Sequence, residues 1–402
     1  MQKIDVVIIG AGPAGLAAAI QLRAYGQSVT VLDEFPKPGG RMLGQLHQEP
    51  SGEWWNGIKE TELMMEQAKQ YDTHIECGVA VYHIEKLDEG YVIYTKKQRI
   101  HATNVLIATG AAEVQAPLPG WTLPGVMSIG AAQVMTNVHR VSVGDKGIIA
   151  GVNVLSAAIA RELQLAGTEL HSMALPAKNV ISEDEAHPQK VMERLVRIAH
   201  LAPSRFIQFG SKFAKNSMIR NLAVKFFPKS GVKMWGMPIH LRKAIVRING
   251  TDAVESVTMV DVTSDGEVIP GTKKDIAVDF VCIAGGLYPL AELAAATGLP
   301  FQFQEELGGH IPIHNDAMET PMEGIYVAGN ITGIESAKVA RAQGKVAGLS
   351  IINNQGKEKV ASKLQSAMEE VNQIRHDASI QFHPNIEYGR KKVAEAFAAA
   401  TK

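Results

Sequence analysis

A strand-like run near the first residue leads directly into a glycine-rich turn. The run reads DVVIIG, with the β-branched composition of a buried parallel strand, and the turn reads GAGPAG. Gly10 permits the tight turn, Gly12 lets backbone N–H groups approach a pyrophosphate, and Gly15 lets the next helix pack close to the strand. Pro13 and Ala14 lie between the last two glycines. The turn predicts a Rossmann-like unit with a dinucleotide phosphate at its helix N-terminus.

A second strand-like run, SVTVL, ends at two acidic residues, Asp33 and Glu34. Asp33 lies 23 residues after Gly10, about where an acidic side chain accepts hydrogen bonds from a ribose. Because strand, turn, helix, second strand and acid follow in order, a dinucleotide site is favoured over a purely structural glycine turn. This first unit alone does not distinguish FAD from NAD.

Three later segments favour FAD. The G-G-R turn in EFPKPGGRM follows a pattern that many flavoproteins use beside the ribityl chain. The segment TNVLIATGAAE resembles the A-T-G turn of flavoproteins with two dinucleotide-binding domains, and GIYVAGNITGIESAKVARAQGKVAG resembles their closing strand–Ala-Gly-Asp–helix motif. In that closing motif the acid accepts a hydrogen bond from a ribityl hydroxyl, and the helix N-terminus faces the flavin pyrimidine ring. Asn330 replaces the acid here, and its amide oxygen can still accept that bond.

Two more residues are candidates for contacts with FAD. His47 follows the G-G turn by a few residues and could border the isoalloxazine ring. Val81 lies where it would touch the adenine. The complete predicted FAD-binding set is Gly10, Gly12, Pro13, Ala14, Gly15, Asp33, Glu34, Gly40, Arg41, His47, Val81, Ala108, Thr109, Gly110, Gly329, Asn330 and Ala337. No catalytic residue is identified.

These segments together resemble the flavoproteins with two dinucleotide-binding domains, a group that includes thioredoxin and lipoamide reductases. Residues 117–133, PLPGWTLPGVMSIGAAQ, and 306–330, ELGGHIPIHNDAMETPMEGIYVAGN, are similar to the FAD-containing subunit shared by hydrogen cyanide synthase, opine oxidases and dye-linked L-proline dehydrogenases. The resemblance covers roughly residues 4–350. It implies an α/β fold with two Rossmann-like dinucleotide-binding domains, the second inserted in the first, and a helical C-terminal tail.

The resemblance also implies domain boundaries. The FAD-binding domain would comprise residues 1–115 and 276–350, the inserted NAD(P)-binding-like domain residues 116–275, and the helical tail residues 351–402. Relatives of this kind are heteromeric dehydrogenases of amines or amino acids, of the proline, hydroxyproline, opine or glycine type, in which a second flavoprotein subunit often oxidises the substrate. Many carry a [2Fe–2S] cluster in a cysteine-rich C-terminal region. The tail here has no cysteine, so a cluster would have to come from a separate small protein.

The inserted domain has a degenerate nucleotide turn. In GVNVLSAAIARELQLAG only Gly151 matches a glycine position, and Asn153 stands where a pyrophosphate should pass against bare backbone. Val154 and Leu155 add apolar bulk, and the later strand TELHSMALP ends without an acid or arginine for the adenosine ribose. We therefore expect this domain to keep its packing role and to have lost NAD(P)H.

The two cysteines, Cys77 and Cys282, exclude several kinds of chemistry. They form no C-x-x-C pair, so a disulfide framework, a cysteine zinc site and a cysteine-held iron–sulfur cluster are not expected within this sequence. Thioredoxin-reductase chemistry is not expected either, and the compartment is predicted to be the reducing cytoplasm. His310 and His314 are separated by Pro312, which argues against a helical metal-binding pair.

Charge and hydropathy exclude two further classes of partner. The net charge of −1 provides no general attraction for nucleic acid or an anionic membrane, and no run approaches the roughly 20 apolar residues of a membrane span. Asp5 and the glycines argue against a signal peptide. Residues 187–206 and 217–231 predict two amphipathic helices that cover the inserted domain, with membrane or partner docking as the alternative. A stand-alone NAD(P)H-dependent flavin reductase for a ferredoxin or quinone, and a catalytically silent scaffold, remain alternatives to the dehydrogenase subunit.

Overall fold

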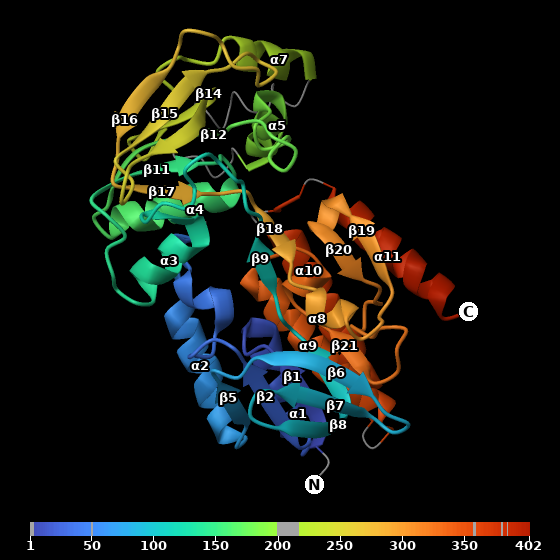
Figure 1. Ribbon diagram of the computed structural model, residues 1–402. Coiled ribbons are helices and arrows are strands. Elements are labelled where there is room, and N and C mark those ends of the chain that lie inside the picture. Colours follow the sequence, from blue (N-terminus) through green and yellow to red (C-terminus); the bar gives the residue numbers. More distant parts are fainter. Residues whose placement is uncertain (1–3, 50, 199–216, 357–358, 379–380, 384) are drawn as a thin grey trace. The chain divides into compact units, whose positions relative to one another are not determined.

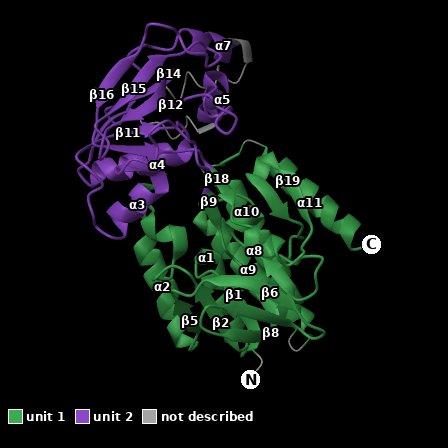
Figure 2. Cartoon of the chain, viewed as in Figure 1, with its two compact units in different colours: residues 1–112, 287–402 green, residues 113–286 purple. Residues whose placement is uncertain are grey.

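The computed structural model describes residues 4–49, 51–198, 217–356, 359–378, 381–383 and 385–402. The chain forms two compact units, the first made of residues 1–112 and 287–402 and the second of residues 113–286 (Figure 2). The second unit is therefore an insertion between two parts of the first. Of the first predicted amphipathic segment, residues 199–206 lie outside the described residues.

The first unit contains a seven-stranded sheet in the order β5-β2-β1-β8-β7-β6, with β21 pairing to β8. The pairs β5–β2, β2–β1, β1–β8 and β8–β21 are parallel. The pairs β8–β7 and β7–β6 are antiparallel. The strand bounds are β1 Ile4–Ile9, β2 Val29–Asp33, β5 His74–Cys77, β6 Val81–Lys86, β7 Tyr91–Thr95, β8 Arg99–Ile107 and β21 Ile325–Val327. The apolar residues at the centre of β1 are fully buried, as expected for a strand that is covered on both faces.

Helices α1 (Pro13–Ala24) and α9 (Ala337–Asn354) pack against each other beside this sheet (Figure 1). Small residues allow this close approach: a Cβ on Gly344 would lie 2.0 Å from the carbonyl oxygen of Ala14. Helix α10 (Ala361–Asp377) packs on α9, and α11 (Ile386–Ala400) packs on the segment around Leu307. Further elements are β3 Leu46–Gln48, β4 Trp54–Asn56, α2 Gly57–Gln70, β9 Ala111–Glu113, β18 Leu287–Pro289, α8 Glu292–Ala295, β19 Phe301–Gln304 and β20 Gly309–Pro312, with β9 paired to β18.

The second unit has an eight-stranded sheet in the order β10-β17-β11-β12-β14-β15-β16, with β13 pairing to β14. The first five strands in this order run parallel, and the others are antiparallel. The strand bounds are β10 Val126–Ser128, β11 Lys146–Ala150, β12 Glu169–Pro176, β13 Val232–Met234, β14 Met237–Asn249, β15 Ser256–Asp261, β16 Lys274–Ala277 and β17 Phe280–Ile283. The described residues of this unit form the helices α3 Ile129–Asn137, α4 Val154–Leu165, α5 Pro188–Ile198 and α7 Ser217–Lys225.

This architecture confirms the predicted fold class. Both units contain a parallel strand–turn–helix–strand unit, β1-α1-β2 in the first and β11-α4-β12 in the second, and the C-terminal residues form helices. Among the described residues, every helix is too short or too polar to cross a bilayer.

Candidate cofactor site

The turn between β1 and α1 is shaped by three glycines with different tasks. Gly10 has a φ of +108°, and a Cβ there would lie 2.3 Å from the carbonyl oxygen of Ala108. A Cβ on Gly15 would lie 1.8 Å from the carbonyl oxygen of Gly10. Both positions therefore exclude any side chain for reasons of packing alone.

Gly12 differs from the other two because the space above it is open. Its φ is −73°, which any residue can adopt, and no atom lies within 4 Å of the position of a Cβ. Gly12 is the N-cap of α1, where no side chain makes a capping hydrogen bond, and Pro13 lies at the start of the helix. The first turn of α1 contains no acidic residue. This helix N-terminus can accordingly accept an anion.

Asp33 closes the turn from the end of β2. Its Oδ2 accepts a hydrogen bond from the Ala11 N–H at 2.5 Å and its Oδ1 accepts one from the Phe35 N–H at 2.7 Å. The side chain is buried; burial raises the pKa of Asp33, and the two backbone N–H groups lower it. Each oxygen keeps a lone pair for a ribose hydroxyl. Glu34 is exposed, so only one of the two acids reaches the turn.

The G-G turn lies directly against the first glycine turn. The Gly39 N–H donates to the carbonyl oxygen of Ala11 at 2.7 Å, and a Cβ on Gly40 would lie 3.2 Å from the Cα of Gly12. Arg41 then donates from Nε to the carbonyl oxygen of Ala111 at 2.8 Å. The G-G turn and the first glycine turn, which are more than twenty residues apart in the sequence, are therefore in contact at Gly12.

The ends of β8 and β21 meet the same turn. The Ala108 N–H donates to the carbonyl oxygen of Ile9 at 2.8 Å, and Thr109 donates from Oγ1 to the carbonyl oxygen of Leu290 at 2.5 Å. Gly110 follows with a φ of +77°. A Cβ on Gly329 would lie 3.0 Å from the Cβ of Ala14. Most of the predicted set therefore gathers around the N-terminus of α1, whereas Val81 lies half-buried at the start of β6.

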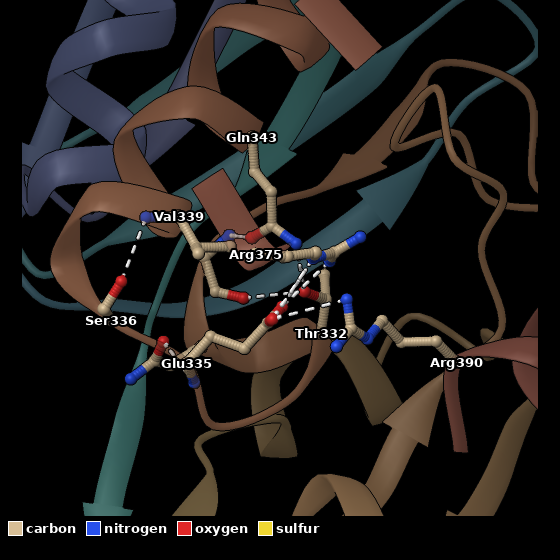
Figure 3. A network of polar contacts seen from close by, with 9 residues as sticks. Thr332, Glu335, Ser336, Val339, Gln343, Arg375 and Arg390 are labelled. Atoms are coloured by element: carbon tan, nitrogen blue, oxygen red, sulfur yellow. Dashed lines mark hydrogen bonds and ion pairs between the residues drawn. The ribbon is translucent and has the colours of Figure 1, made fainter. Parts of the chain in front are cut away.

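The turn from Gly329 to α9 is held by polar side chains (Figure 3). The Gly329 N–H donates to Gln343 Oε1 at 2.9 Å, and Gln343 Nε2 donates to Thr332 Oγ1 at 3.0 Å. Asn330 accepts at Oδ1 from the Glu335 N–H at 3.3 Å. Ser336 caps α9, whose first residue is Ala337. Sequence reasoning missed Gln343, which is 1% exposed, because a glutamine in a helix that also carries lysine and arginine residues gives no distinctive signal.

His47 reaches the N-terminus of α9 through two charged side chains. Its Nε2 lies 3.2 Å from Glu49 Oε1, and Lys338 Nζ donates to the same oxygen at 2.9 Å. Burial raises the pKa of Glu49, but Lys338 and His47 together bring it below its ordinary value. The rings of His47 and Trp55 stack with centroids 6.2 Å apart, and the buried indole N–H of Trp55 has no hydrogen-bond partner among the described residues.

The two thiols are not arranged for redox chemistry. Cys77 is half-buried, and burial together with Asp33 raises the pKa of its thiol. Cys282 is fully buried in the other unit, and burial raises its pKa strongly. Both groups stay protonated at neutral pH and are poor nucleophiles. Within the described ranges, no group of three or more His, Cys, Asp or Glu side chains is placed to hold a metal ion. His310 contacts Phe303, and His314 lies 2.7 Å from the carbonyl oxygen of Pro312.

Asn153 caps the second nucleotide-like helix with its own side chain. Its Oδ1 accepts from the Ser156 N–H at 2.8 Å, and Ser156 Oγ accepts from the Asn153 N–H at 2.9 Å, which completes a capping box. Asn153 Nδ2 also donates to the carbonyl oxygen of Ala284 at 3.1 Å. The backbone N–H groups at the N-terminus of α4 correspond to those that would bind a pyrophosphate at α1. At α4 they are partly occupied by the capping box.

Replacing Asn153 by alanine is expected to destabilise the chain by about 1–2 kcal/mol, because the capping box and the bond to Ala284 are lost. Urea unfolding followed by circular dichroism measures this loss. Asn385→Ala is the matched control, since Asn385 is the N-cap of α11 without a side-chain capping bond and should change the free energy of unfolding by less than about 0.5 kcal/mol. Equal effects at both positions would contradict the structural role of the cap.

Comparison with known proteins supports the predicted resemblance. A family model described as "Pyridine nucleotide-disulphide oxidoreductase" matches residues 4–200 and 204–344. The A subunit of the opine oxidase of Agrobacterium tumefaciens is 25% identical over 364 residues, which cover 87% of this chain and 65% of that protein. The HcnB subunit of the hydrogen cyanide synthase of Pseudomonas protegens is 23% identical over 368 residues, covering 88% of this chain and 71% of that protein. The chain spans less than two thirds of the length of two opine oxidase relatives, 65% for A. tumefaciens and 63% for Rhizobium meliloti.

Solved structures share the fold. The L-proline dehydrogenase from P. horikoshii superposes with a TM-score of 0.65 at 20% identity, covering 92% of this chain and 59% of that one. The thioredoxin reductase from T. acidophilum has a TM-score of 0.62 at 21% identity, covering 89% of this chain and 100% of that one. At these identities the likeness concerns the fold and not the reaction.

Proposed function

The chain belongs to the pyridine nucleotide-disulphide oxidoreductase family, and from this premise we propose that it is the FAD-binding, electron-transferring subunit of a heteromeric amine or amino-acid dehydrogenase. The observation that carries the proposal is the uncapped N-terminus of α1, with open space above Gly12 and with Asp33, Gly40, Ala108 and Gly329 gathered around it. Similar proteins are themselves named as subunits, of opine oxidase and of hydrogen cyanide synthase, which supports a role within a larger assembly.

The residues present fit FAD. The first turn of α1 would hold the pyrophosphate with its N–H groups, and the absent side chain of Gly12 leaves the room that the phosphates need. Asp33 would accept the hydroxyls of the adenosine ribose, and Asn330 would hydrogen-bond the ribityl chain. Bound FAD would supply acceptance of two electrons and their release to an acceptor. The thiols provide no redox pair of their own, so electrons would leave through an external acceptor.

The capping box at Asn153 favours this proposal over an NAD(P)H-dependent reductase. A nicotinamide nucleotide would have to displace the bonds between Asn153 and Ser156 before its pyrophosphate could reach the N–H groups of α4. The second unit would then have a structural role and would provide surfaces that contact other subunits. A catalytically silent scaffold is the remaining alternative, and it differs from our proposal in predicting no electron transfer.

The partners that we propose are a second flavoprotein subunit, which would oxidise a small amine or amino acid, and a small [2Fe–2S] protein if the assembly contains a cluster. Residues 351–402 contain no cysteine with which to hold one. Both cysteines of the chain are free thiols, and the compartment that we propose is therefore the cytoplasm.

The isolated chain is expected to show little amine dehydrogenase turnover until a partner subunit is added, because similar proteins are named as subunits of larger enzymes. Dye-reduction assays with proline, hydroxyproline, sarcosine and opines, with and without co-expressed neighbouring gene products, measure this dependence. We expect activity in the co-expressed complex at least about 100-fold above the isolated chain, in keeping with the contribution of a general base. Full turnover from this chain alone with any of these substrates would contradict the proposal.

A further inference from the structure

We propose that Arg375 of α10 and Arg390 of α11 are positioning residues of the flavin site, which act on it through Glu335. This inference rests on the proposed function, because it concerns the turn that would carry the flavin. It assigns the two C-terminal helices a part in cofactor binding. Figure 3 shows both arginine side chains converging on the Glu335 carboxylate from their separate helices.

The contact between Arg375 and Glu335 has two-point geometry. Arg375 Nε lies 3.1 Å from Oε1 and 3.2 Å from Oε2 of Glu335, and Nη2 donates to Oε2 at 2.8 Å. The two side chains are only 12% and 9% exposed, so water screens this pair weakly. Arg390 Nη1 adds a longer contact of 3.6 Å to Oε1. A planar guanidinium that grips both carboxylate oxygens fixes the direction of the glutamate as well as its place.

Glu335 transmits this position to the cofactor turn through its backbone. Its N–H donates to Asn330 Oδ1 at 3.3 Å, and Asn330 is the residue expected to meet the ribityl chain. On its other side, the turn is anchored by Gln343, which contacts both Gly329 and Thr332. The segment between Gly329 and α9 is therefore held from α9 at one end and from α10 and α11 at the other. Loss of the contacts between Arg375 and Glu335 would release the turn at Glu335, while the contacts of Gln343 with Gly329 and Thr332 would remain.

The first test is Arg375→Lys, which keeps the positive charge and removes the two-point geometry. We expect the Kd for FAD, measured by fluorescence titration of the apoprotein, to rise roughly tenfold. A tenfold rise corresponds to the loss of about one hydrogen bond between the turn and the cofactor. Arg390→Gln should raise it less, because its contact is longer. Lys345→Gln is the matched control: Lys345 and Glu370 also join α9 to α10 at 2.6 Å, but they are exposed and lie away from the turn. The control should leave the Kd unchanged.

A second readout separates positioning from mere stability. Glu335→Gln keeps the shape and an acceptor for Arg375 while removing one negative charge, so we expect the midpoint potential of the bound flavin to rise relative to the wild type and to Lys345→Gln. Thermal unfolding of each apoprotein is measured in parallel. A lower melting temperature with unchanged Kd and unchanged potential would overturn the inference and reduce the network to a structural one. A wild-type chain that binds no FAD would overturn the proposed function itself, whereas FAD bound equally by wild type and Arg375→Lys would overturn this inference alone.

Discussion

Replacing Gly12 by valine is expected to yield a folded chain that carries no FAD. The backbone at Gly12 has a φ of −73° and no atom lies within 4 Å of its Cβ position, so a side chain there meets nothing in the protein itself. It would instead occupy the path of the pyrophosphate and block the N–H groups of the first turn of α1. Each lost charge-assisted bond is worth roughly 1.5–3 kcal/mol, and losing two of them weakens binding by at least about 100-fold.

The measurement is the ratio of released FAD to protein, identified by chromatography, together with thermal unfolding of the apoprotein. Ala24→Val is the matched control, because it adds the same branched side chain to an exposed position of the same helix and should retain full FAD. Release of FMN, absence of flavin from the wild type, or full FAD content in Gly12→Val would each contradict the predicted site. Gly15→Val is unsuitable as a test, since its Cβ would collide with the carbonyl oxygen of Gly10 and damage the fold.

NADH and NADPH are expected to reduce the bound flavin slowly or not at all. Hydride transfer requires the nicotinamide ring to be held near the flavin, and the protein contributes that orientation. At α4 the Ser156 N–H is already bound to Asn153 Oδ1, and the Asn153 N–H to Ser156 Oγ. A pyrophosphate would therefore lose two charge-assisted bonds of roughly 1.5–3 kcal/mol each, which weakens binding by about two to four orders of magnitude.

Anaerobic stopped-flow with millimolar NADH, in which the absorbance of oxidised flavin is followed, measures this reaction. Dithionite serves as the control that the bound flavin can be reduced under the same conditions. Fast bleaching that saturates with NADH concentration would refute the prediction and make the reductase the leading function. Faster bleaching in Asn153→Ala than in the wild type would show that the capping box helps to exclude the nucleotide.

Elements whose conformation depends on neighbouring residues alone could be predicted from the sequence. The glycine pattern of the first turn was sufficient to assign Gly10 and Gly15, because a φ of +108° at Gly10 and the close packing at Gly15 exclude side chains through backbone geometry alone. The order of strands, turns and helices predicted the fold class and the family for the same reason, since each motif is contained within a short stretch of chain. The degenerate second turn was also visible as Asn153 in place of a glycine.

Contacts between side chains that are distant in the sequence became visible only in the folded chain. The sequence placed both Asp33 and Glu34 in the predicted set, and only packing shows that Asp33 binds the turn while Glu34 is exposed. It also could not show that Asn153 uses its amide as a cap, which depends on Ala284 lying beside it. The grip of Arg375 on Glu335 joins residues that are 40 positions apart, and no local pattern marks either of them. Such contacts depend on the packing of α9, α10 and α11, which sequence periodicity predicts as helices without specifying which side chains they bring together.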